Sequence, residues 1–186
     1  MKRIGFTVLA MVAVGCAPPA PPPPAPPSSV VTDSIKTGFD IGKNFITQAA
    51  EQMAEADFAF KPTGVAAEVR SFGQLVGHVA NANYLFCSMV SGEAGPGVDI
   101  EQTATSKADL TKALGEAFAF CDRAFGSVND QTGADPLRVD FLNADLTKLG
   151  VLAFNNAHNM EHYGNIVTYM RAKGMVPPSS QSQGGN

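Results

Sequence analysis

The chain has 186 residues, which is long enough for one domain with a hydrophobic core once a leader is removed. Its 17 acidic and 13 basic residues give a formal net charge of −4, and no basic patch with interleaved aromatic residues occurs. Because phosphate binding requires clustered lysine and arginine, this composition argues against nucleic acid as a partner.

Residues 1–16 have the layout of an export signal. A lysine and an arginine follow the first methionine, and the apolar run over residues 4–14 is too short to span a bilayer. Small residues then lead to Cys16, as in a bacterial lipobox, where this cysteine would be lipidated and become the first mature residue. Ala13 stands where leucine is most usual, so ordinary signal-peptide cleavage nearby is the alternative. In both cases we expect export to the bacterial periplasm or the outer face of a membrane, and the lipobox interpretation, which we favour, adds a lipid anchor.

A proline-rich linker follows at residues 17–29. Its prolines and alanines favour polyproline II and include no core-forming side chain, so the segment is expected to act as a semi-rigid spacer. The folded domain is predicted over residues 30–178, and the polar, glycine-rich residues 179–186 are expected to form a flexible tail.

The domain shows helical periodicity and no convincing alternating strand pattern. Ser71 and Ser106 are the best N-cap candidates for the second and third helices. The four predicted helices cover about residues 33–55, 72–90, 106–125 and 145–173. Breakers between the last two predict a long loop over residues 126–145, in which a short strand or helical turn remains an alternative. Loops of that length are more often functional than idle. The expected fold class is all-α, a four-helix bundle with this long loop between helices 3 and 4.

The three histidines of the chain fall on two of these helices. His158 and His162 are one helical turn apart and share a face, with Asn155 and Asn156 nearby as candidate hydrogen-bonding partners for the imidazoles. His78 is expected at a core position of the second helix, whose apolar stripe is predicted to comprise Leu75, His78, Ala82, Leu85 and Met89. Three imidazoles around one divalent ion would leave a coordination position open, as in catalytic sites. The alternative is a core histidine satisfied by hydrogen bonds and a pair that arises by chance.

Glu161 completes an H-x-x-E-H pattern, the signature of inverted zinc proteases, in which it would be the general base. That class takes its third metal ligand from well downstream in a larger fold. Only 24 residues follow His162, so we discount the protease interpretation.

Cys87 and Cys121 are expected on different helices. Export would permit a disulfide between them. Two buried free thiols are an equal alternative, because sequence does not supply the separation of their Cα atoms.

Four segments carry a resemblance to a known family: RSFGQLVGH at 70–78, HNMEHYGNI at 158–166, YMR at 169–171 and GMVPP at 174–178. They resemble the DinB/YfiT-like proteins, four-helix bundles unrelated to the DNA polymerase that shares the name. The resemblance covers about residues 33–178. It implies that His78, His158 and His162 bind a divalent metal ion, which is zinc or nickel in various members. Some relatives are thiol-dependent transferases or isomerases, in which the metal holds a thiolate.

The sequence therefore predicts an exported DinB-like protein that binds a divalent metal through three histidines. A metal-dependent transferase or hydrolase acting on a small molecule is the first hypothesis, with Glu161 or Tyr84 as candidates for proton transfer or orientation. Small thiol cofactors are cytosolic, which argues against carrying the thiol chemistry over to an exported chain. The alternatives are a non-catalytic metal-binding or stress-related envelope lipoprotein and a binding module for a small ligand. The sequence does not decide whether the chain forms a homodimer, which remains an alternative to a monomer.

Overall fold

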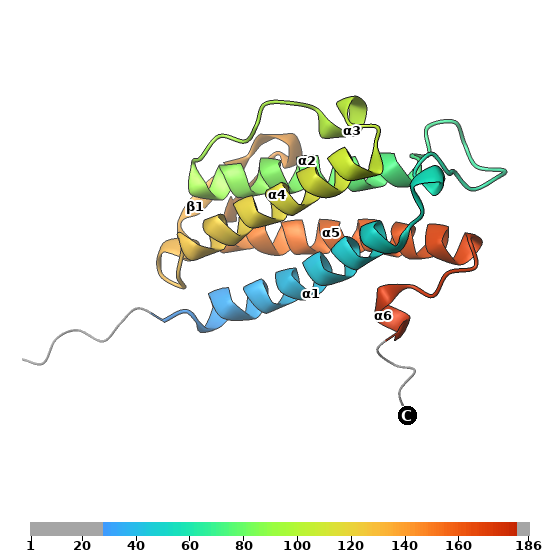
Figure 1. Ribbon diagram of the computed structural model, residues 1–186. Helices are drawn as coiled ribbons and strands as arrows, with labels where there is room; N and C mark the ends of the chain where they lie inside the picture. Colours follow the sequence, from blue (N-terminus) through green and yellow to red (C-terminus); the bar gives the residue numbers. More distant parts are fainter. Residues whose placement is uncertain (1–27, 182–186) are drawn as a thin grey trace, which may run out of the picture.

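A computed structural model describes residues 28–181, and the predictions for the export signal, Cys16, most of the proline-rich linker and the end of the tail lie outside these residues. The described part is a bundle of four long helices, which confirms the predicted all-α class (Figure 1). The long helices are α1 (Val30–Gln52), α2 (Phe72–Ser91), α4 (Lys107–Gly126) and α5 (Lys148–Ala172). The shorter elements are α3 (Ile100–Thr103), α6 (Pro178–Gln181), three 3-10 turns (Glu55–Asp57, Thr132–Ala134 and Asp140–Leu142) and the strands β1 (Pro136–Val139) and β2 (Ala144–Thr147).

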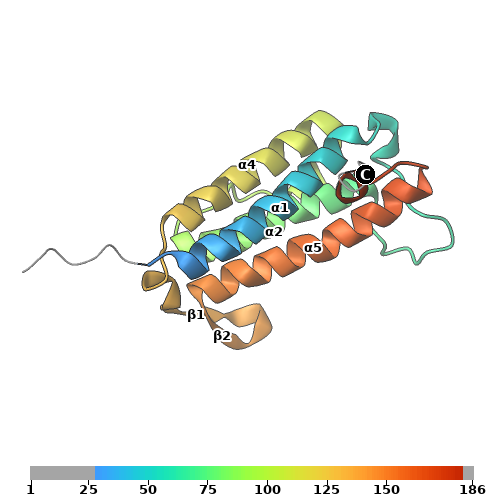
Figure 2. The same ribbon diagram turned by 90° about the horizontal axis from the view of Figure 1, so that it is seen from below.

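The helices pack as α2 against α4, α1 against α5, and α2 against α5. In Figure 1, α2 and α4 run in one direction and α1 and α5 in the opposite one, so the α2–α4 connection must return along the bundle. Figure 2 shows the same four helices side by side, with the hairpin at one end. The largest fully buried side chains come from all four long helices, from the C-cap of α1 at Met53 and from β1: Phe39, Ile46, Met53, Phe72, Val76, Val79, Leu110, Leu114, Val139, Leu152, Ile166 and Met170.

Local capping fixes the starts of three helices. The Ser71 hydroxyl accepts the Gln74 N–H at 3.2 Å, while the Gln74 side chain accepts the Ser71 N–H at 2.8 Å, a reciprocal capping box. Ser106 caps α4 by accepting the Asp109 N–H at 3.0 Å. Thr147 caps α5 in the same way. The two serine caps are where the sequence predicted them.

The first helix begins three residues earlier than predicted because a residue far along the chain caps it. The Asp130 carboxylate accepts the N–H groups of Val31 and Thr32, at 3.3 and 2.9 Å. It also accepts the hydroxyls of Ser28 and Thr32. Since Asp130 lies 98 positions beyond Thr32, sequence reasoning about the helix start could not include it.

The predicted loop over residues 126–145 is only partly a loop, because it contains the short strands and helical turns that the sequence left open for this segment. β1 and β2 form an antiparallel hairpin in which Leu137 pairs with Leu146. Each strand has four residues and neither face is fully buried, so the alternation was too short and weak to recognise. Because β2 occupies residues 144–147, α5 begins at Lys148 and not at about Asp145, where the sequence predicted its start.

The predicted apolar stripe of the second helix is partly displaced: Leu75 and Ala82 are buried as expected, but other members are not. Leu85 is 50% exposed, and His78 lies half-buried at the edge of the core and not inside it. The buried face instead centres on Val76, Val79 and Phe86, because α2 faces α4 and α5 on that side. Its other side is covered in part by the one-turn helix α3.

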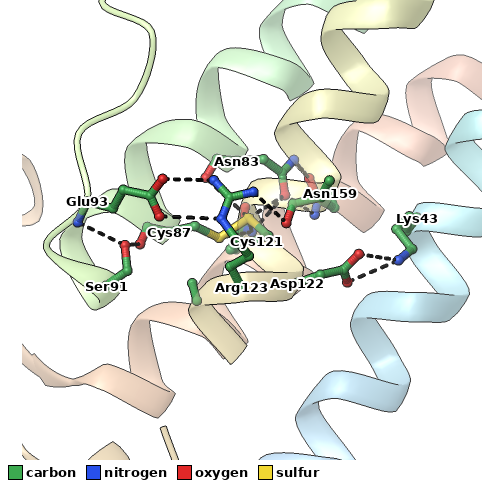
Figure 3. Close-up of a disulfide and its surroundings, with 12 residues drawn as sticks. Lys43, Asn83, Cys87, Ser91, Glu93, Cys121, Asp122, Arg123 and Asn159 are labelled. Carbon is green, nitrogen blue, oxygen red and sulfur yellow. Dashed lines mark hydrogen bonds and ion pairs between the residues drawn. A yellow bond between two sulfur atoms is a disulfide. The ribbon is translucent and has the colours of Figure 1, made fainter. Parts of the chain in front are cut away.

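Cys87 of α2 and Cys121 of α4 form a disulfide in the core, and both residues are fully buried (Figure 3). Next to it lies a buried amide cluster, in which Asn83 accepts from Asn155 at 2.9 Å and donates to Asn159 at 2.8 Å. The covalent link and the amide cluster together tie α2 to α4 and α5. Among the helices of residues 28–181, none combines the length and apolar character needed to cross a membrane.

Candidate metal centre

The three histidines lie together between α2 and α5. The imidazole centroid of His162 is 4.6 Å from that of His78 and 4.4 Å from that of His158. One nitrogen from each ring can be chosen so that all three lie within 4.8 Å of one another. The one-turn spacing on α5 aims two rings at the same point, and the antiparallel packing of α2 on α5 brings His78 opposite them.

His158 and His162 are held in the neutral form. Burial, with the neighbouring imidazoles, lowers the pKa of His158 to about 4. Burial and the charges of His78 and Arg70 likewise lower the pKa of His162 to about 4. A neutral imidazole has a free lone pair, which is the form that binds a metal ion.

Glu101 of α3 orients His78, and sequence reasoning missed it. One carboxylate oxygen lies 2.9 Å from His78 Nδ1, and the other accepts from Arg70 Nε at 2.7 Å. A carboxylate on Nδ1 fixes the imidazole tautomer that leaves Nε2 free for a metal. No spacing rule connects position 101 to position 78, so the sequence offered no signal for this contact.

A close approach of α3 to α2 puts Glu101 in reach. A Cβ atom on Gly77 would lie 2.7 Å from the Glu101 Cα, so α3 can occupy this position only over a glycine. Asn81 then holds the start of α3: it donates to the Asp99 carboxylate at 2.7 Å and accepts the Ile100 N–H at 2.9 Å.

The arrangement fits a divalent metal ion. Nε2 of His158 lies 3.1 Å from Nε2 of His162. The ligands of a tetrahedral zinc ion, at about 2.0–2.1 Å from it, lie roughly 3.3 Å apart. Within residues 28–181, the buried Nδ1 atoms of these two histidines have no hydrogen-bond partner, so only His78 has its ring anchored by a carboxylate. The three histidines could hold a metal ion and leave coordination positions open.

The asparagines predicted to support the histidines bind elsewhere. Asn155 donates to Asn83 in the buried amide cluster, and Asn156 donates to the Ile35 carbonyl at 2.8 Å. Neither amide is bonded to an imidazole in the described structure, so the hydrogen bonds to the histidines expected of them are not found.

Neither of the two candidates for proton transfer makes a hydrogen bond to a histidine in the described structure. Glu161 is exposed on α5 and makes no ion pair within residues 28–181. Tyr84 packs on Phe120 and lines a separate cavity that includes Gly95 but none of the three histidines.

Two cavities meet at the histidines. The larger, of about 470 Å³, is called the aromatic cavity here; its walls include Arg70, His78, Phe86, Phe141, Phe154 and His158. The other, of about 380 Å³, is called the α5-end cavity; its walls include Val65, Glu68, Arg70, His162 and Tyr169. Small molecules could therefore reach the histidines from two sides.

A four-helix bundle that turns three histidines toward one point belongs to the class of candidate metal-binding bundles. The family model of the DinB superfamily matches residues 43–166, and the chain belongs to this superfamily. A DinB-like protein from Bacillus subtilis of known structure has a TM-score of 0.60 and 21% identity, covering 77% of this chain and 93% of that one. A conserved protein from Enterococcus faecalis has a TM-score of 0.60 and 15% identity, covering 76% and 95%. These likenesses show the fold. A comparison with curated proteins gives no significant match.

Proposed function

We propose that this chain is an exported member of the DinB superfamily that binds zinc or nickel through His78, His158 and His162. The bound ion serves a transferase or hydrolase reaction on a small molecule. The observation that carries this proposal is the convergence of three imidazoles, two of which, those of His78 and His158, line a cavity of about 470 Å³.

The side chains around the ion have different roles in binding it. His158 and His162 bind in the neutral form set by burial, while Glu101 holds His78 in the correct tautomer. A divalent ion in such a three-histidine site supplies Lewis acidity and lowers the pKa of a bound water or thiol. The aromatic cavity holds the body of the small molecule and limits the water around its reacting group.

Export of the chain is part of the proposal. The N-terminal charge and apolar run, the Cys16 lipobox and the buried Cys87–Cys121 disulfide all support it, because disulfides persist in oxidising compartments. Labelling of the expressed chain with radioactive palmitate, lost in Cys16→Ser, tests the lipid anchor. Labelling that is equal in both would contradict it.

One observation favours a non-catalytic metal-binding or ligand-binding role as the second candidate. In the described structure, Glu101 is the only carboxylate on the walls of the aromatic cavity, and both of its oxygens are already engaged, by His78 and Arg70. A general base independent of the metal is therefore missing from these walls. A reaction at this site would have to rely on metal-bound water or on a group of the small molecule itself.

Metal content tests the proposal. The full chain is purified, and its zinc and nickel are measured by mass spectrometry beside His78→Ala, His158→Ala and His162→Ala. Glu161→Ala is the matched control, since it removes an exposed side chain from the same turn of α5. We expect about one ion per chain in the parent and the control and loss of the ion in each histidine variant. Unchanged metal in the histidine variants would overturn the proposal.

A further inference from the structure

We propose that the aromatic cavity is a binding pocket for small organic anions with an aromatic body. The anionic group lies at the metal and Arg70, and the body lies against Phe86, Phe141 and Phe154. The inference rests on the proposed metal site and adds the chemical class of the small molecule.

The walls of the cavity hold apolar side chains that the fold leaves in contact with water. Leu85, Phe141 and Phe154 all line it, and they are 50, 58 and 37% exposed. Single exposed apolar residues are common, but three around one concave site near histidines indicate a ligand surface. A volume of about 470 Å³ is in the range of small-molecule pockets.

The aromatic rings form a continuous wall that ends at the metal centre. The Phe86 ring lies 5.9 Å from Phe141, 5.4 Å from Phe154 and 5.7 Å from His158. Phe141 comes from the 3-10 turn at the tip of the β1–β2 hairpin, so the segment that sequence reasoning took for a long loop supplies one side of the pocket. Planar aromatic bodies fit edge-to-face or offset against such rings.

The positive charge of Arg70 and of the metal ion favours an anionic group at the end of the ligand opposite its aromatic body. Arg70 uses Nε for Glu101, and within residues 28–181 its two terminal nitrogens make no hydrogen bond. The charges of Glu101 and Arg70 cancel. A divalent ion held by neutral imidazoles would therefore leave the part of the cavity near His78 and His158 positive. A carboxylate or similar anion can satisfy both the ion and the guanidinium.

The α5-end cavity is less suited to this ligand. It carries the carboxylate of Glu68 beside Arg70, and within residues 28–181 its only aromatic rings are those of Tyr169 and the ligand His162. An anion entering there would be repelled by Glu68, and its body would find less aromatic surface.

Two probes with the same metal-binding group test the inference on the full, cobalt-loaded chain. Acetohydroxamate and benzohydroxamate differ in the phenyl ring, and the visible spectrum of the cobalt reports binding. We expect benzohydroxamate to bind roughly tenfold or more tightly than acetohydroxamate, because the ring is removed from water against the phenylalanines. Benzoate should compete with benzohydroxamate, and the neutral benzyl alcohol should compete far less.

The variants are Phe154→Ala and Phe141→Ala, with Val65→Ala as the matched control in the α5-end cavity. All three residues are at least 37% exposed, so folding should be retained. Loss of the preference for benzohydroxamate in both phenylalanine variants, with its retention in Val65→Ala, supports the pocket. Loss only in Val65→Ala, or equal binding of both hydroxamates by the parent, overturns the pocket while the metal site stands. If cobalt does not bind, or neither hydroxamate changes its spectrum, the proposed function fails first.

Discussion

At the scale of single residues, Glu101 decides how well His78 can serve as a metal ligand. Its carboxylate is only 12% exposed and bridges Arg70 and the His78 Nδ1. A buried carboxylate in this position fixes the ring and raises the basicity of the opposite nitrogen. His158 and His162 lack such a partner within residues 28–181, so the site depends on this one orienting group.

We expect Glu101→Gln to weaken metal binding by about 10–100-fold while the fold is kept, because a neutral amide holds the imidazole less firmly. Competition with a chelator of known affinity measures the dissociation constant. Glu161→Gln is the control, since Glu161 is exposed and contacts no histidine ring nitrogen. Equal metal affinities of Glu101→Gln and Glu161→Gln would show that Glu101 does not orient His78 for metal binding.

At the scale of elements, the one-turn helix α3 links a glycine to the metal centre. Gly77 allows α3 to approach α2, and this approach places Glu101 at His78. An added methyl group would meet the backbone of Glu101, which cannot rotate away as a flexible side chain could. The whole of α3 would have to shift.

Gly77→Ala should therefore weaken metal binding and speed amide hydrogen exchange in residues 100–103, with α4 and α5 unaffected. Gly115→Ala is the control, because a Cβ on Gly115 of α4 meets nothing within 4 Å. That control should keep its metal and gain slightly in stability, since alanine favours helix over glycine by up to about 1 kcal/mol. Normal metal affinity in Gly77→Ala would show that metal binding does not depend on the close approach of α3 to α2.

The start of α1 predicts a pH dependence. Hydrogen bonds from Ser28, Thr32 and Val31 lower the pKa of the Asp130 carboxyl from 3.8 to about 2. A lowered folded-state pKa stabilises the protein above 3.8, and this stabilisation is lost as the pH falls toward 2. Asp130→Asn should therefore be less stable than the parent at neutral pH, and the difference should shrink across that window.

Chemical denaturation of both proteins at a series of pH values measures the effect. Asp33→Asn is a suitable control: Asp33 lies in the first turn of the same helix, but its side chain makes no hydrogen bond in the described structure. A gap between parent and Asp130→Asn that does not change with pH would mean that the charge on Asp130 contributes nothing.

At the scale of the whole molecule, the disulfide closes the α2–α4 crossover. Cys87 and Cys121 are separated by 34 positions. Closing a loop of this length restricts the unfolded chain and is worth roughly 3–4 kcal/mol in the chain-entropy model. Cys87→Ala/Cys121→Ala should lose a large part of this stability, measured by denaturant unfolding. The parent in reducing agent should fall to a similar value, and a double variant as stable as the oxidised parent would contradict this.

The sequence predicted what depends on neighbours along the chain. The caps at Ser71 and Ser106 and the shared face of His158 and His162 follow from residues within one turn of each other. The features that it missed depend on distant partners. Asp130 extends α1 backward, Glu101 reaches His78 across two elements, and the hairpin forms from two strands too short to show a pattern.

The orientation of α2 in the bundle is a further feature that depends on distant partners and could not be predicted from the sequence. The spacing of Leu75, His78, Ala82 and Leu85 marks one side of the helix correctly as a shared face. How this face turns relative to the core is decided by α4 and α5: the core centres on Val79 and Phe86, and of the predicted face only Leu75 and Ala82 are buried at its edge. Leu85 is left exposed on a cavity wall as a result.

X-ray absorption spectroscopy of the metal-loaded full chain tests the central claim most directly, because it reports the atoms bound to the ion. The account predicts three imidazole nitrogens at about 2.0–2.1 Å for zinc, with a light exogenous ligand completing the coordination. The imidazole signal should fall in His78→Ala. Sulfur in the coordination sphere, or a spectrum without imidazole scattering, would contradict a three-histidine site.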